Sequence, residues 1–188
     1  MALVEVSLSM SIDGFITGPD EHGAGLGRGG DALHYWFTKD PAGPELLDDA
    51  LFATCGAVVT SRKIYDGTDG WGDTGFYRMP VFVLTHRPHD MVVKGDTTFT
   101  FVTDGIESAI AQARAAAGDK KVHIMGGASV AQQAFEAGLV DTLHLHLAPV
   151  ILGGGTRLFG NLTKPITLQR TGNSDSRYAT HLRFRVTK

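Results

Sequence analysis

The residues best suited to binding a charged ligand lie between positions 121 and 135. This stretch combines a short apolar strand, a Gly126-Gly127 turn and a helix that begins with small residues and Ser129. Glycine lets the backbone approach a ligand because it has no Cβ, and the first turn of a helix presents unpaired N–H groups at the positive end of its dipole. Such a turn favours a phosphate or pyrophosphate. Taken alone, it is equally compatible with a plain connection that binds nothing.

Two basic clusters follow other predicted strands. Ser61-Arg62-Lys63 follows the apolar run 55–60, and Thr85-His86-Arg87 follows the run 80–84. The carboxyl ends of parallel strands share one edge of a sheet, where ligands bind, and guanidinium groups pair with phosphate oxygens in a bidentate manner. No acid follows these strands in the position where it would bind the two free ribose hydroxyls of NAD. The pattern therefore favours NADP over NAD.

The elements that would position these clusters alternate between strand and helix. We predict strands near residues 3–10, 55–60, 80–84, 98–102, 121–125, 142–152, 166–171 and 178–186, and helices near 32–37, 44–52, 61–66 and 105–117, with a further helix from 128 that ends at Gly138. This alternation predicts an α/β fold with a mainly parallel sheet between helices. The last two strands alternate as an antiparallel hairpin does, so we place them at one edge.

A polar, glycine-rich segment from 17 to 31 is too long for an ordinary connection and is expected to be a mobile lid or binding loop. Residues 25–30 satisfy the dinucleotide pattern G-x-G-x-x-G. That fingerprint requires a strand immediately before it, whereas Pro19, Asp20 and Glu21 come first here. We therefore reject the match.

Composition indicates one soluble domain over residues 1–188. A net charge of −3 offers no basic footprint for nucleic acid, and a single cysteine, Cys55, excludes an intrachain disulfide. No basic leader and no run of ~20 apolar residues is present, so we expect a cytoplasmic protein without a membrane segment. Neither a phosphate-binding P-loop nor a G-x-S-x-G nucleophile motif occurs.

Two histidines, His144 and His146, fall on one face of a predicted strand whose other face carries leucines. With no cysteine or carboxylate at recognisable spacing, an amphipathic strand that contacts another subunit is favoured over a metal site. We therefore predict no metal.

Several motifs occur in an order typical of one family. They are Ser9-Met10-Ser11-Ile12-Asp13-Gly14-Phe15-Ile16, the strand that leads to Arg62, Val83-Leu84-Thr85, Met125-Gly126-Gly127-Ala128-Ser129, Gly138-Leu139-Val140-Asp141 and the stretch 149–159. Together they resemble the dihydrofolate reductase-like superfamily, and more closely its branch named for the C-terminal reductase domain of the bifunctional riboflavin-biosynthesis enzyme. The resemblance covers nearly the whole chain. It implies a three-layer αβα fold, NADPH as hydride donor and usually a homodimer.

The resemblance also implies roles for individual residues. The pyrophosphate would be held by Gly126, Gly127, Ala128, Ser129 and Val130. The adenosine 2′-phosphate would be surrounded by Arg62, Thr85 and Arg87, and the nicotinamide would be bordered by Ser9, Phe15 and Ile16. Four further residues are expected to contact the cofactor: Ser61, Lys63, His86 and Met125. Trp36 and the Gly154 loop would contact the substrate beneath the lid. The family usually has glycine where Ser61 stands and often threonine where Ile64 stands, which leaves the second phosphate contact open.

The substrate is not determined by these residues. Asp13 is the carboxylate nearest the expected nicotinamide, and we predict that it orients the substrate or supplies a proton, although Asp-Gly is also an ordinary turn pair. Folate reduction would need a buried acid near the predicted helix 32–37, where Asp31 and Asp40 stand. A phosphoribosyl-pyrimidine would instead need basic groups, for which Arg28, Lys39 and Arg78 are candidates. Another small C=N or C=O compound also fits. The alternative is a protein that binds NADP(H) without turnover.

Overall fold

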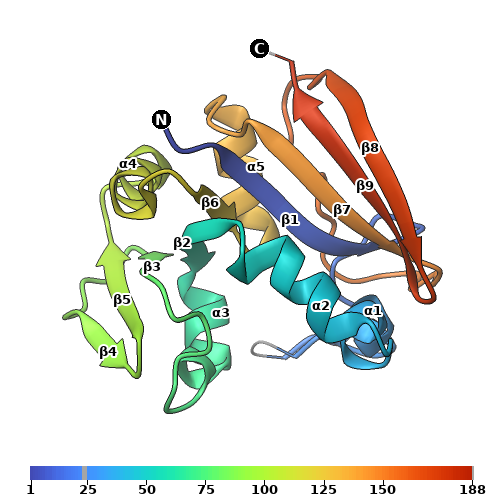
Figure 1. Ribbon diagram of the computed structural model, residues 1–188, viewed down its shortest axis with the longest axis horizontal. Helices are drawn as coiled ribbons and strands as arrows, with labels where there is room; N and C mark the ends of the chain where they lie inside the picture. The colour runs from blue at the N-terminus through green and yellow to red at the C-terminus, as the bar shows by residue number, and fades with distance from the viewer. Residues whose placement is uncertain (23–24, 188) are drawn as a thin grey trace.

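The computed structural model describes residues 1–22 and 25–187. In this part of the chain a nine-stranded sheet has the order β4-β5-β3-β2-β6-β1-β7-β9-β8. The strands are β1 (Val4–Ser11), β2 (Cys55–Ser61), β3 (Val81–Leu84), β4 (Val92–Lys94), β5 (Thr97–Val102), β6 (Lys121–Ile124), β7 (Thr142–Ala148), β8 (Leu168–Ser176) and β9 (Ala179–Val186). Both termini lie at the same end of the sheet (Figure 1).

Pairing is parallel through the centre and antiparallel at both edges. β5, β3, β2, β6, β1 and β7 pair in parallel, whereas β4 joins β5, and β9 joins β7 and β8, in antiparallel register. The predicted mainly parallel sheet with an antiparallel C-terminal hairpin is therefore confirmed. The sequence did not predict β4, because it has only three residues and none of them is buried.

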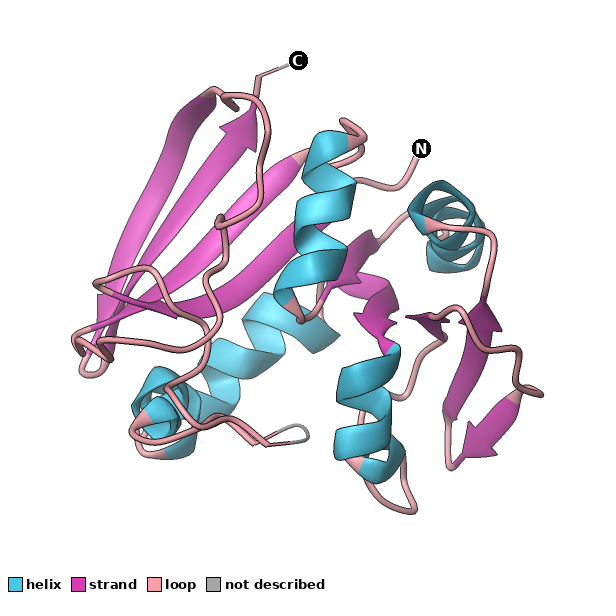
Figure 2. Cartoon of the chain, turned by 180° about the vertical axis from the view of Figure 1, so that it is seen from behind, coloured by secondary structure: helices cyan, strands magenta, loops and turns pink. Residues whose placement is uncertain are grey.

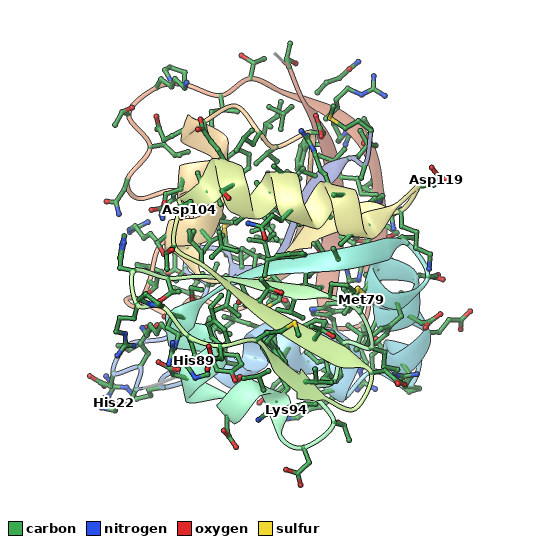
Figure 3. All side chains as sticks on the ribbon, turned by 90° about the vertical axis from the view of Figure 1, so that its left-hand side faces the viewer. His22, Met79, His89, Lys94, Asp104 and Asp119 are labelled. Carbon is green, nitrogen blue, oxygen red and sulfur yellow. The ribbon has the colours of Figure 1, made fainter. Side chains whose placement is uncertain are left out.

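Helices cover both faces of the sheet, as Figure 2 shows from behind. They are η1 (Gly30–His34), α1 (Tyr35–Thr38), α2 (Gly43–Leu47), η2 (Asp48–Phe52), α3 (Arg62–Gly67), η3 (Asp69–Trp71), α4 (Ile106–Ala117) and α5 (Ala128–Glu136). Seen onto the β4–β5 edge, Asp104 and Asp119 mark the two ends of α4 (Figure 3). None of the helices described here is long and apolar enough to cross a membrane.

The two faces of the sheet differ in chemistry. One face packs valines, isoleucines and leucines against α4 and α5. The other is apolar around β2, β3 and β5, where Val58, Val83 and Phe99 pack with η2. Around β1 and β7 that same face carries Ser7 and Ser9 beside histidines, all of them buried. Polar groups buried in this way need partners, so this half of the face is suited to a binding site.

Element ends differ most from the prediction at two places. The strand predicted over 142–152 ends at Ala148, because Pro149 has no N–H to donate to the ladder. The following chain turns instead, and Ile12 N donates to Val150 O at 3.0 Å. The penultimate strand is longer than predicted and runs to Ser176 as the edge of the sheet.

Candidate active site

A cleft of about 950 Å³ lies over the polar half of the sheet. Its walls come from the strand ends of β1, β2 and β6, from α1 and η2, from α3, and from the start of α5. Of the predicted site residues, it is lined by Ser9, Ile16, Trp36, Ser61, Lys63, Met125, Gly126, Gly127, Ala128 and Ser129. Its size is typical of a cofactor or substrate site.

The Gly126-Gly127 turn forms one end of this cleft. Gly126 has φ +64°, a conformation that side chains rarely adopt. Thr60 in the neighbouring strand holds the turn, because its hydroxyl donates to Met125 O at 3.3 Å and to Gly126 O at 3.4 Å. Gly127 is extended and caps α5 without any side-chain hydrogen bond. The first turn of a nine-residue helix is thus uncapped where it meets the cleft, which suits an anion.

The departure from the family pattern at Ser61 has a local structural effect. The Ser61 hydroxyl accepts a hydrogen bond from Ile64 N at 3.3 Å and so caps the start of α3. The backbone N–H of Ile64 is therefore already engaged within the protein. Ser61 itself lines the cleft beside Gly127.

The three strand ends predicted to meet do lie side by side. β3, β2 and β6 are adjacent and parallel, with Ser61 opposite Leu84 in register. Arg62 and Arg87 come together on one carboxylate: Arg62 Nε lies 2.6 Å from Asp66 Oδ1, and Arg87 Nη2 lies 3.2 Å from Asp66 Oδ2. No acid was predicted at this edge of the sheet. Asp66 stands four residues after Arg62, on the same side of α3, so helical spacing was the available signal.

The surroundings of this arginine pair match the predicted anion site in part. Thr85 is buried, and its hydroxyl accepts a hydrogen bond from Arg87 N at 3.1 Å. Arg62, Thr85, His86 and Arg87 lie beside the cleft lining rather than in it, and His86 is exposed. A group bound to both arginines would therefore lie at the outer end of the cleft.

Aromatic and polar side chains form the other end. Trp36 Nε1 donates to Ser9 Oγ at 2.9 Å, and the Trp36 ring stacks on His146 with centroids 4.1 Å apart. Phe37 also lines this end. Two further polar residues there, Ser7 and His123, were not predicted, although alternate serines along 7–11 marked this face of the strand.

Asp13 does not lie where the prediction required. Its carboxylate accepts hydrogen bonds from Leu152 N at 3.1 Å and Gly153 N at 2.7 Å, and it is not among the described residues that line the cleft. A hydrogen bond from Ser11 and these two N–H groups lower the pKa of Asp13 to about 2. Asp13 therefore anchors the 152–155 loop and is ionised at neutral pH, which makes it a poor proton source.

The lid segment is attached to the rest of the site by several contacts. Glu21 pairs with Lys63 of α3 and accepts from the Thr156 hydroxyl at 3.0 Å. Thr156 N donates to the Thr17 hydroxyl at 2.9 Å. Gly154 lies against Pro19, which confirms that the 153–155 loop is next to the lid, although Gly154 does not line the cleft. Residues 23 and 24 of the predicted loop lie outside the described residues.

Three predicted residues belong to the packing around the cleft. Phe15 is buried, with the Arg157 guanidinium 4.3 Å from the centroid of its ring. Val130 is buried in the core between α5 and the sheet. The candidate substrate cations Arg28, Lys39 and Arg78 do not line the cleft: Arg28 pairs with Asp20, and the other two lie over the rings of Tyr35 and Phe52.

Burial keeps His123 neutral, which makes folding dependent on pH. Burial, with a smaller effect of Lys121, lowers the pKa of His123 from 6.5 to about 4. The unfolded chain therefore binds a proton that the folded chain excludes, so stability is fully present above pH 6.5 and is lost as the pH falls towards 4. Between pH 7 and pH 5 we expect this residue alone to cost about 2 kcal/mol.

Urea unfolding of the wild type and His123→Gln at both pH values measures this loss. When the pH falls from 7 to 5, the free energy of unfolding should decrease by about 2 kcal/mol less in the variant than in the wild type. The exposed His86→Gln substitution serves as the control and should leave the dependence unchanged. Equal pH dependence in the wild type and His123→Gln would show that His123 accepts a proton in the folded state.

Comparisons with known proteins agree with this geometry. A model described as the RibD C-terminal domain matches residues 2–177. A putative riboflavin biosynthesis protein from Shewanella sp. PV-4 has a TM-score of 0.78 at 24% identity, with 100% of each chain covered. Dihydrofolate reductase from Enterococcus faecalis, complexed with NADP(H) and RAB-propyl, has a TM-score of 0.65 at 12% identity, covering 99% of this chain and 97% of that one. A pyrimidine reductase-like protein from Corynebacterium diphtheriae has a TM-score of 0.60 at 19% identity, covering 100% and 92%. A search of curated proteins gave no match.

Proposed function

Because the chain belongs to the family of RibD C-terminal domains, we propose that it is an NADPH-dependent reductase of a small heterocyclic compound. The observation that carries this proposal is one continuous cleft. It joins an uncapped glycine turn at the start of α5 to Ser9 and Trp36 at the other end. That span suits a dinucleotide with a substrate beside its reactive ring.

The proposed cofactor makes use of features described above. Its pyrophosphate would lie at the Gly126-Gly127 turn, and its 2′-phosphate at Arg62 and Arg87. NADPH supplies the hydride, whereas the protein supplies position, electrostatics and exclusion of water. The Enterococcus faecalis reductase of the same fold is complexed with NADP(H), which supports this choice of cofactor.

The substrate end suits a flat ring with polar edges. Trp36 and Phe37 offer aromatic surface, while Ser7, Ser9 and His123 offer hydrogen-bonding groups. A pyrimidine or pteridine has both properties. The likenesses to a putative riboflavin biosynthesis protein and to a pyrimidine reductase-like protein favour a pyrimidine intermediate of the riboflavin pathway. The likeness to dihydrofolate reductase makes folate the second substrate to test.

One observation favours the alternative, a protein that binds NADP(H) without turnover. Glu21 is the single carboxylate among the described residues that line the cleft, and it is paired with Lys63. An acid free to donate a proton is therefore not provided there. Reduction would need a proton from solvent or from a hydroxyl group.

Titration with NADPH and with NADH, followed by cofactor fluorescence, tests the proposal. We expect NADPH to bind in the range usual for enzyme ligands and NADH to bind more weakly. No binding of NADPH at ~100 μM, within the ordinary range of Michaelis constants, would refute the proposal. If NADPH binds, turnover with dihydrofolate and with the riboflavin-pathway pyrimidine should be measured. Binding without turnover of either compound would favour the non-catalytic alternative.

A further inference from the structure

Three histidines converge on the polar face of the sheet. His144 and His146 are two residues apart in β7 and therefore point to the same side. His181 in β9 stands directly opposite His146 in the antiparallel register. His181 was not predicted as a third ligand because it lies 35 residues further along the chain than His146. The antiparallel pairing of β9 with β7 brings it into place.

The ring nitrogens of these histidines are close enough to share one ion. One nitrogen from each lies within 4.8 Å of the other two. His146 Nδ1 and His181 Nδ1 are 2.7 Å apart. At this distance the N–H of one neutral ring can donate to the bare nitrogen of the other. A metal ion bound to both nitrogens would take the place of that shared proton.

The third histidine is incompletely satisfied. His144 is 4% exposed, and its Nε2 is buried without a hydrogen-bond partner among the described residues. Nearly all buried polar atoms in proteins have a partner, and an exception calls for an explanation such as an ion. His146 and His181 place their other nitrogens differently: His146 Nε2 lies 3.2 Å from Ser7 Oγ, and His181 Nε2 lies 3.0 Å from Ser176 Oγ. These outer contacts orient the rings, as they do around ligating histidines.

We propose that His144, His146 and His181 bind a divalent transition metal, with Zn²⁺ as the first candidate. Imidazole nitrogens suit Zn²⁺, Cu²⁺ and Ni²⁺, whereas Mg²⁺ and Ca²⁺ require oxygen ligands. Three histidines and one open position form the ligand set of a known class of zinc site. The inference does not depend on the proposed reductase activity.

The surroundings accommodate such an ion. Trp36 covers the face of the His146 ring, while a metal bonds in the plane of the ring, so the two contacts do not compete. Arg183 stands opposite His144 in register and is exposed, and the charges of Asp175 and Asp40 also act on His181. No carboxylate belongs to the cluster in the described chain. An ion held by three neutral nitrogens must therefore be one with strong affinity for imidazole.

Zinc binding to the whole chain tests the proposal. Protein without a histidine tag is stripped with a chelator and titrated with Zn²⁺ in competition with a chromophoric chelator. We expect one equivalent per chain. Ser176→Ala, which removes an outer contact, should weaken Zn²⁺ by about 10-fold. His144→Gln and His181→Gln remove ligands and should weaken it by more than about 100-fold.

His123→Gln is the matched control, because His123 is buried on the same face with an unpartnered Nδ1 but lies outside the cluster. It should bind Zn²⁺ like the wild type. The proposal would be overturned if His181→Gln bound Zn²⁺ as tightly as the wild type. It would also be overturned if His123→Gln weakened Zn²⁺ binding as much as the ligand substitutions do. The wild type with Co²⁺ in place of Zn²⁺ gives a second measurement that needs no variant. X-ray absorption should show three imidazole ligands, and their absence would also overturn it.

Discussion

Arg62→Ala should weaken NADPH binding by about 1–3 kcal/mol, the usual scale for a hydrogen bond to a charged group, and leave NADH nearly unchanged. The reason is that Arg62 and Arg87 converge on Asp66 beside the cleft, where they would bind the phosphate that distinguishes the two cofactors. Fluorescence titration with both cofactors gives the two dissociation constants. The substitution removes a partly exposed ion pair between neighbouring turns of α3, and such pairs contribute little to stability, so the variant should fold normally.

Gly127→Ala provides the complementary measurement. Gly127 has φ −66°, which alanine adopts readily, and an added Cβ would meet only the Ser61 hydroxyl at 3.6 Å. The methyl group would narrow the turn where the pyrophosphate is expected, so both cofactors should weaken equally. Arg170→Ala, a change of an exposed arginine in β8, should affect neither. Equal losses of NADPH and NADH in Arg62→Ala would show that Arg62 does not recognise the 2′-phosphate.

Gly155→Ala should destabilise the protein by about 2–4 kcal/mol and displace the lid. Gly155 has φ +118°, and an added Cβ would stand 2.0 Å from Thr17 O. Backbone atoms cannot give way as a flexible side chain does. The loop would have to move, and the hydrogen bond from Thr156 N to Thr17 Oγ1 would be lost. Urea unfolding measures the change in free energy.

Gly153→Ala is the control for Gly155→Ala. Gly153 has φ +71°, but an added Cβ would meet no atom within 4 Å. The free energy of unfolding should therefore fall only by the cost of placing alanine in a left-handed backbone conformation, about 1 kcal/mol. Losses of the same size at both positions would mean that the contact between Gly155 and Thr17 is not rigid.

The sequence predicted the arrangement of the strand ends because that arrangement follows from local rules. Alternating strands and helices imply parallel neighbours, and parallel neighbours place residues such as Arg62 and Gly126 at one edge. The role of Asp13 could not be obtained in this way. Its partners, Leu152 N and Gly153 N, belong to a loop almost 140 positions further along the chain, and the geometry of such a loop has no periodic signal.

The histidine cluster was missed for a related reason. The spacing of His144 and His146 showed that they share a face, but the third member depends on the register of an antiparallel partner. That register pairs His146 of β7 with His181 of β9. A shift of one residue would turn His181 to the opposite face. Register therefore decides whether two histidines have a third beside them.

The carboxylate between the two arginines has a further consequence for how an anion would be received. Two guanidinium groups repel each other, and holding them together in an empty site normally costs free energy. Asp66 offsets that repulsion before any ligand arrives, with contacts of 2.6 Å to Arg62 and 3.2 Å to Arg87. A phosphate would then meet two donors that are already oriented. Such preorganisation lowers the entropic cost of binding and makes the spacing of the arginines a property of the folded chain.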